Sequence, residues 1–192
     1  MRLGELVAAS SAVASTTARN AKVGVLAELL ARAGADEVAP VVSWLSGELT
    51  QRQIGVGWAL LRERPPPAAE PSLTVAQLER ALGAIGALGG PGSVAARRAA
   101  VQALLARADA AEQDFLLRLL LGDLRQGALA GVMTDAAARA AGLPASELRR
   151  ALTLHGDLPA VAAIALSDGR DGLGRVRLQV GRPLAPMLAG TA

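Results

Sequence analysis

The sequence repeats itself at a distance of 75 residues. Residues 29–49 align without a gap with residues 104–124, ten of the 21 aligned pairs are identical, and the stretch LLARA occurs in both copies. Each copy ends in a Gly-x-Leu segment. Two copies are too few for a solenoid. We therefore expect two related three-helix units, at about 2–57 and 77–132, that share one core about a pseudo-two-fold axis.

Helix patterns cover most of the sequence and predict an all-α fold with a short extended segment near the C-terminus. Leucines at helix spacing predict a helix over Ala18–Ala33. Only Arg175–Val180 alternates as a strand does. The stretch Pro65–Ser72 cannot be helical throughout, so it is either a linker or a long surface connection. The residues expected to cap helices are Gly34 at a C-terminus and Asp36, Thr74, Ser93, Asp109 and Asp157 at N-termini, the last of these starting a short helix.

The composition excludes several kinds of site. There is no cysteine and a single histidine, His155, so disulfides, thiolate zinc sites and cysteine nucleophiles are excluded, and a histidine-based metal site or triad is disfavoured. The sequence has no run of about 18 consecutive apolar residues, so no membrane span is predicted. The net charge is +3, and all basic residues except Lys22 are arginine. We expect Trp44 and Trp58 to be core anchors, because both lie in apolar helical contexts.

The segment Phe115–Met133 contains the strongest local candidate for a binding turn. A leucine-rich helix stops at Gly122, and two glycines, Gly122 and Gly127, bracket Arg125. This pattern suits close approach of the backbone to an anion, with a guanidinium ready to bind it. The helix starts near Thr17 and Ser93 are related by the repeat, so they could hold both strands of a duplex at once. The alternatives are an ordinary helix connection and a duplication that only builds a core.

Several segments, taken together and in order, resemble the N-terminal DNA-binding domain of ATP-dependent DNA ligases. Gly122–Ala128 resembles the family's G-x-L-R-I-G-L segment, and Thr16–Lys22 with its following leucines resembles its T-S-x-R-x-x-K helix. The other segments that match in the same order are Trp44–Leu49 with Gln53–Gly57, Gly90–Arg98, Gly156–Leu158 and Val180–Ala189. The sequence is most similar to bacterial members from high-GC organisms.

This resemblance implies a helical domain, residues 1–180, that clamps nicked duplex DNA through its backbone and minor groove without reading sequence. Residues 181–192 would then be a linker toward a nucleotidyltransferase domain. Asp123 stands where many relatives carry a basic residue, and Gln126 and Ala128 replace apolar ones. The residues that the resemblance assigns to DNA contact are Thr17, Arg19, Lys22, Gly92, Ser93, Arg97, Arg98, Gly122, Arg125 and Gly127.

The resemblance also implies which parts of the reaction lie elsewhere. Ligation in the family begins at a lysine in a K-x-D-G motif, and the single lysine, Lys22, precedes Val-Gly-Val. We therefore expect no catalytic residue, metal site or cofactor in this chain, which would be a fragment of a larger ligase that uses ATP and Mg²⁺. The expected partners are nicked duplex DNA and the adenylation and OB-fold domains of the same protein. We expect a monomer in the cytoplasm, associated with the nucleoid and not with a membrane.

The alternative from a different class is a helical protein–protein interaction module that does not bind DNA. It predicts an exposed apolar patch and scattered arginines. DNA binding instead predicts that Arg19, Arg97, Arg98 and Arg125 face one surface beside exposed helix N-termini.

Overall fold

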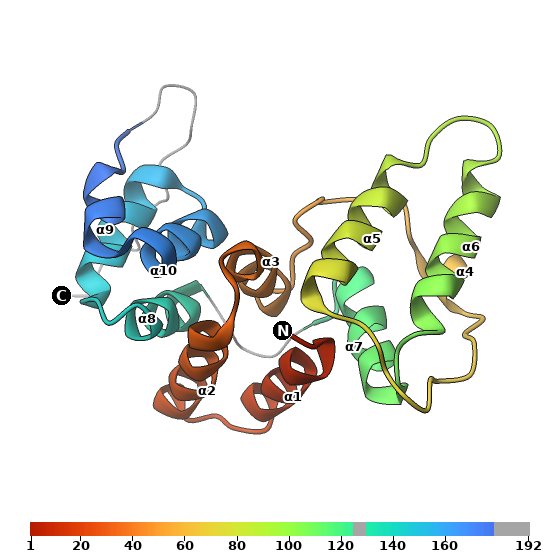
Figure 1. The fold of residues 1–192 in the computed structure, drawn as a ribbon, viewed down its shortest axis with the longest axis horizontal. Coiled ribbons are helices and arrows are strands. Elements are labelled where there is room, and N and C mark those ends of the chain that lie inside the picture. Colours follow the sequence, from red (N-terminus) through yellow and green to blue (C-terminus); the bar gives the residue numbers. More distant parts are fainter. Residues whose placement is uncertain (125–129, 179–192) are drawn as a thin grey trace.

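Leucine and alanine at helix spacing form helices over most of the chain. The computed structural model describes residues 1–124 and 130–178. These residues form ten α-helices and no strand, so the predicted all-α class is confirmed (Figure 1). The helices are α1 (Leu3–Ala14), α2 (Arg19–Arg32), α3 (Ala35–Leu45), α4 (Trp58–Leu61), α5 (Val75–Ala87), α6 (Ser93–Leu105), α7 (Ala110–Leu120), α8 (Ala130–Ala140), α9 (Ala145–His155) and α10 (Leu158–Arg175).

Two expectations at the C-terminal end are wrong for the described residues. The strand predicted to begin at Arg175 does not form, because Arg175 ends α10 and residues 176–178 have no strand beside them. The last helix is also not short, since α10 has 18 residues and continues past a non-helical Gly169. Residues 179–180 of the predicted strand, and the expected linker at 181–192, lie outside the described residues.

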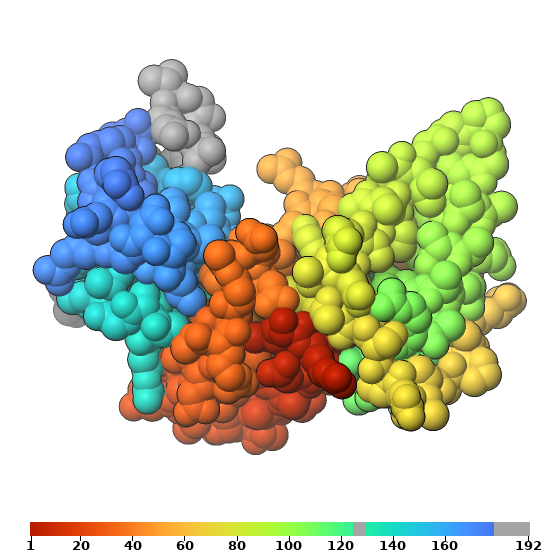
Figure 2. Space-filling view, viewed as in Figure 1, coloured from red at the N-terminus to blue at the C-terminus, as the bar shows by residue number. Residues whose placement is uncertain are grey.

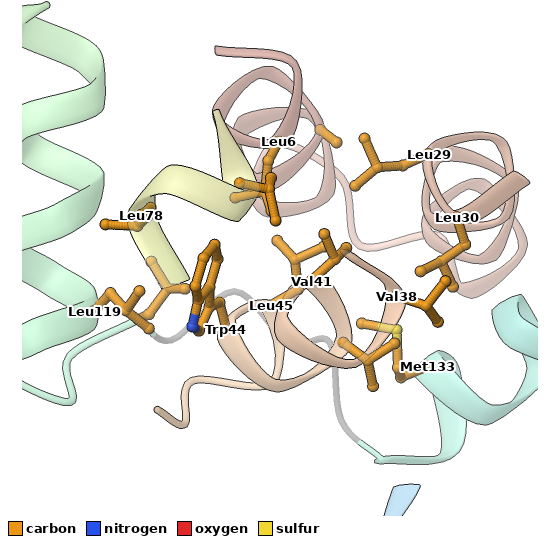
Figure 3. Packing of buried hydrophobic residues seen from close by; sticks show 14 of the residues in the cluster. Leu6, Leu29, Leu30, Val38, Val41, Trp44, Leu45, Leu78, Leu119 and Met133 are labelled. Atoms are coloured by element: carbon orange, nitrogen blue, oxygen red, sulfur yellow. The ribbon is translucent and has the colours of Figure 1, made fainter. Parts of the chain in front are cut away.

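Helix α3 is the centre of the core. Its side chains face three groups of neighbours: Trp44 lies toward Leu78 and Leu119, Val41 toward Leu6, and Val38 toward Met133 (Figure 3). A helix that is apolar on all sides must be covered on all sides. Helices α5 and α10 both contact α3, so the two halves of the chain and its C-terminal helices share this core.

Helix starts agree with the predicted capping boxes at two positions and differ at two others. The Thr74 and Asp109 side chains accept the N–H of Gln77 and Glu112, at 3.2 and 2.8 Å, as predicted. Asp36 and Ser93 are not N-caps. They lie inside α3 and α6, whose N-caps are glycines, Gly34 and Gly92, and Gly34 does not end α2.

The helix ends that close the two predicted repeat units share one hydrogen-bond pattern. At the end of α3, Gly47 N–H donates to the Trp44 carbonyl and Glu48 N–H to the Ser43 carbonyl, at 2.9 and 3.0 Å. The same two bonds end α7 at 3.1 and 2.8 Å, with Gly122 in the place of Gly47. Both glycines have positive φ, at 86° and 73°, which is the conformation of a Schellman cap. The bounds of α7 also lie 75 residues after those of α3.

The first helices of the two units are related by a shorter distance. At the start of α1, Arg2 N–H donates to Glu5 Oε1 at 3.0 Å, and at the start of α5, Thr74 N–H donates to Gln77 Oε1 at 3.2 Å. These equivalent bonds are 72 residues apart, three fewer than the shift that relates α3 to α7. The register of the repeat therefore changes between its first and last helices.

Contacts between the two units are reciprocal. Helix α1 packs on α7, and its counterpart α5 packs on α3, the counterpart of α7. An antiparallel bridge joins Arg2 to Thr74 between the starts of α1 and α5. Reciprocal contacts are the property of an isologous pair. The relation of the halves by a two-fold rotation stays a prediction.

The proline-rich stretch is a surface connection bound to the second unit. Ala68 N–H donates to the Ala108 carbonyl at 2.9 Å, and Ser72 N–H to the Arg107 carbonyl at 3.1 Å. Figure 2 shows a hollow on one side of the molecule, over α3 and between the blue helices α9 and α10 and the yellow-green helices α5 and α6. No helix in the described part of the chain is long and apolar enough to cross a membrane.

Candidate nucleic-acid interface

The Gly122 turn presents bare backbone. Gly122 is exposed, and a Cβ built on it would have no atom of residues 1–124 or 130–178 within 4 Å. The positive φ favours glycine, and the open space leaves the peptide accessible to a ligand. Arg125 and Gly127 follow in the same segment but lie outside the described residues, as do Gln126 and Ala128.

The start of α2 is exposed and lacks a side-chain cap. Its N-cap is Ala18, whose side chain has no acceptor, and the preceding Thr17 is exposed. The first-turn N–H groups of α2 therefore receive no hydrogen bond from an N-cap side chain. Free N–H groups of this kind let helix starts bind phosphate. Lys22 lies one turn further along α2 and is half-buried.

Arg19 connects the start of α2 to the segment that follows the Gly122 turn. Its Nη2 donates to the Gly131 carbonyl at 3.1 Å and to Asp135 Oδ2 at 2.7 Å, both in α8. Helices α2 and α8 pack along each other in Figure 1. The start of α2, which the resemblance assigns to DNA, therefore lies beside the first residues of α8, more than 100 positions later in the chain.

The start of α6 is the second exposed helix start. Its N-cap Gly92 is exposed with a φ of 80°, and half-buried Ser93 is the first helical residue. Arg97 lies inward: its Nη2 donates to the Leu88 carbonyl at 2.5 Å, and its guanidinium carbon is 3.2 Å from a Cβ built on Gly55. Arg97 therefore holds the α5–α6 turn against the segment that leads into α4.

Arg98 is the outward-facing arginine of this helix. Its side chain is half exposed, and Nη1 lies 3.8 Å from Glu63 Oε2, a pair that contributes little at the surface. Its guanidinium is thus available to another anion at small cost.

Each of these two helices packs on a helix from the other side of the proline-rich stretch, so we call residues before and after that stretch the two halves of the chain. Helix α2, from the first unit, packs on α8, which follows the Gly122 turn of the second unit. Helix α6, from the second unit, packs on α4, which follows the Gly47 turn of the first unit. Each candidate site is therefore composed of both halves.

The described arginines do not form one cluster. Arg19 bonds to α8, whereas Arg97 and Arg98 bond to the α5–α6 turn and to Glu63. Figure 1 shows α2 and α6 on opposite sides of α3 and α5. Arg19 therefore lies apart from Arg97 and Arg98, which differs from the prediction that these arginines gather on one surface, and Arg125 lies outside the described residues.

Sequence reasoning was right about one tryptophan and wrong about the other. Trp44 is fully buried and packs in the core, as predicted. Trp58 is 62% exposed. The apolar residues around it form α4, a helix of only four residues. Leu60 and Leu61 of α4 are buried, whereas the Trp58 side chain faces solvent.

One buried carboxyl joins the two repeat units at the start of α7. Glu112 is buried, and its Oε2 accepts the Asp109 N–H at 3.2 Å while Oε1 lies near Gly4 of α1. Desolvation by burial raises the pKa of Glu112 above 4.5, the nearby Asp109 charge adds to this rise, and hydrogen bonds from the Asp109 and Gly4 backbones oppose it. Within residues 1–124 and 130–178, no group of three His, Cys, Asp or Glu residues could hold a metal ion.

Comparison with known proteins agrees with the motifs. A family model described as DNA ligase N terminus matches residues 59–138. Proteins named probable DNA ligase from Mycolicibacterium gilvum and Mycolicibacterium paratuberculosis are 59% and 58% identical over 192 residues, which is 100% and 99% of this chain. Another from Anaeromyxobacter dehalogenans is 54% identical over 196 residues. The chain spans 38%, 37% and 38% of the length of these three relatives. The resemblance inferred from the motifs is confirmed: the chain is similar over its whole length to proteins named probable DNA ligase, and its middle part matches the model of the DNA ligase N terminus.

Proposed function

We propose that this chain binds nicked duplex DNA through its backbone and minor groove, as the DNA-binding domain of an ATP-dependent DNA ligase that seals nicks in replication, repair and recombination. The observation that supports this most is the contact of Arg19 with Gly131, because it places the uncapped start of α2 beside the segment that follows the open Gly122 turn. Such a site offers backbone N–H groups and a guanidinium to phosphate oxygens.

The two composite sites suit the two strands of a duplex. The starts of α2 and α6 are equivalent in the repeat, and the two strands of a duplex are related by local two-fold axes. Contacts to phosphate carry no base information, so binding is independent of sequence. The assigned contacts are Thr17, Arg19, Lys22, Gly92, Ser93, Arg97, Arg98, Gly122, Arg125 and Gly127.

The chemistry of ligation belongs to other domains in this proposal. Lys22 lies in α2 and is followed by Val-Gly-Val, and the described residues hold no carboxylate cluster for a metal. In this proposal ATP and Mg²⁺ are bound by the rest of the parent ligase. The domain, residues 1–180, acts as a monomer in the cytoplasm, at the nucleoid, joined by 181–192 to an adenylation domain and an OB-fold domain.

The direct test measures affinity for intact and nicked duplexes of unrelated sequence over a range of salt concentrations. We expect affinities that do not depend on sequence, and a linear fall of log K with log salt whose slope is about −0.9 for each phosphate contacted. Binding that ignores ionic strength, or no binding, would overturn the proposal.

A second test replaces the arginine of the candidate turn. Arg125→Ala should weaken binding to all duplexes and lower the salt slope by about one. The matched control is Arg80→Ala, an exposed arginine in the middle of α5 that lies in neither composite site. If Arg125→Ala binds like the parent, the turn does not contact DNA.

The interaction module remains the second candidate because Trp58 and Val94 are large exposed apolar side chains and the described arginines are separated. A stable protein interface buries at least about 1,000 Å², much more than two side chains offer. Chemical-shift mapping with duplex DNA separates the two functions. Shifts at the starts of α2 and α6 support DNA binding, and a duplex that shifts no resonance favours the module.

A further inference from the structure

Asp135 of α8 bridges arginines from two other helices. Its Oδ2 accepts Arg19 Nη2 of α2 at 2.7 Å, and its Oδ1 accepts Arg149 Nη2 of α9 at 2.5 Å. The Asp135 side chain is 21% exposed, whereas the Arg19 and Arg149 side chains are 55% and 58% exposed. The carboxylate therefore lies beneath two outward guanidinium groups and fixes their separation.

The bridge has a net positive charge. One carboxylate faces two guanidinium groups, so one positive charge is not neutralised. The bonds in the bridge use only Nη2 of each arginine, and the Nε and Nη1 donors of these exposed groups take no part in it. A guanidinium carries five N–H donors in a planar fork that matches a phosphate.

Other charged groups near the bridge add to this excess. Arg139 Nη1 of α8 is 3.7 Å from a Cβ built on Gly24 of α2. The acid of α9, Glu147, is paired with Arg170 at 2.9 Å. The junction of α2, α8 and α9 is therefore a cationic surface.

We propose that Arg149 contacts a backbone phosphate of the duplex, held beside Arg19 by Asp135, which acts as a positioning residue. Arg19 alone is enough to join α2 to Asp135 of α8. Arg149 adds a second positive charge, which the single carboxylate cannot neutralise. This extends the α2 site to α9, a helix to which no DNA contact was assigned. The inference rests on the proposed function of duplex binding.

The test compares Arg149→Gln with Arg150→Gln in the whole chain, using fluorescence anisotropy with a labelled nicked duplex at several salt concentrations. Arg150 is exposed and is the next residue of α9, so it points about 100° away around the helix and loses the same charge. We expect Arg149→Gln to lower the salt slope by about one and the affinity by roughly three- to tenfold, with Arg150→Gln close to the parent.

Two further variants separate binding from folding. Arg149→Lys keeps the charge, so it should restore the salt slope, and all variants should match the parent in far-UV circular dichroism and thermal melting. Asp135→Asn removes the carboxylate that positions the two arginines, but it also makes the local charge more positive by one. The salt slope of this variant should therefore be at least as steep as that of the parent.

The possible outcomes distinguish failure of this inference from failure of the proposed duplex binding. A parent chain that binds the duplex with the expected salt dependence, together with an Arg149→Gln variant that behaves like it, overturns the inference and leaves the function standing. Equal losses in Arg149→Gln and Arg150→Gln also overturn it, because they indicate a general charge effect. A parent chain that binds no duplex overturns both.

Discussion

Gly47 and Gly122 end equivalent helices with the same pair of backbone hydrogen bonds, but their surroundings differ. A Cβ built on Gly47 lies 3.4 Å from the Leu124 carbonyl oxygen, whereas one built on Gly122 meets no atom of the described residues within 4 Å. The first turn is therefore packed against the segment that follows the second, and the second is open to solvent. The repeat thus provides the same local structure twice, and tertiary packing leaves only one copy free to approach a ligand.

The largest expected effect contrasts the core positions that precede the two turns. Trp44 and Leu119 are counterparts in the repeat, and both are buried. Trp44→Ala should lower the free energy of unfolding by about 3–5 kcal/mol, because the indole fills space between α3, α5 and α7. Leu119→Ala should cost less, about 2–3 kcal/mol. Urea denaturation measures both, and a larger loss for Leu119→Ala would show that α3 is not the central helix.

The sharpest contrast replaces the two glycines themselves. Gly47→Ala and Gly122→Ala should each cost about 1–2 kcal/mol of stability, because both residues have positive φ. Only Gly122→Ala should also weaken duplex binding, since its new methyl group would stand between the backbone and the ligand. Thermal melting and anisotropy on the same samples give both quantities. Equal losses of affinity would mean that the difference in surroundings has no functional role.

A smaller effect separates the starts of α3 and α7. Asp109→Ala should cost about 1 kcal/mol, because it removes the acceptor for the Glu112 N–H at 2.8 Å. Gly34→Ala, at the equivalent position, should change stability by only a few tenths of a kcal/mol, because its φ of −64° suits alanine and no side-chain cap is lost. Chemical denaturation of both variants tests this, and a Gly34→Ala variant as unstable as Asp109→Ala would contradict it.

The smallest effect concerns the pH dependence of the second unit. Because the pKa of Glu112 is raised in the folded chain, the folded state holds its proton to higher pH than the unfolded state. The contribution of Glu112 to stability is therefore fully present below 4.5, its ordinary pKa, and declines as pH rises through the raised pKa. Glu112→Gln should abolish this decline. Unfolding free energies of both proteins from about pH 4 to pH 7 measure it, and parallel curves would refute the assignment.

Local signals predicted local structure well. The boxes at Thr74 and Asp109 form because all their atoms lie within one helical turn. The same reasoning failed at Asp36 and Ser93, since a preceding glycine takes the N-cap position in each case. Gly92 does so with a φ of 80°, a conformation that glycine adopts readily and most other residues do not.

Tertiary neighbours decided what the sequence pattern could not. The exposure of Trp58 depends on what covers a helix of one turn, and the apolar pattern around it contains no such information. The alternating residues from Arg175 had no partner strand among the described residues, so they did not form one. The motifs assigned Arg19 to DNA, but its position beside Gly131 and Asp135 joins residues more than 100 positions apart. Asp135 was missed for this reason.

The reciprocal packing of α2 on α8 and of α6 on α4 has a consequence for how such a fold can be divided. Either half, cut away, keeps its helix start but loses the segment against which that start is placed. No fragment of one half holds a complete site, so cleavage within the proline-rich connection should abolish binding only once the halves separate. The contacts of α1 with α7 and of α5 with α3 are those that two copies of a single three-helix unit would make as a dimer. Fusing the copies into one chain keeps both partners at equal concentration and frees one turn to diverge while the other holds the pair together.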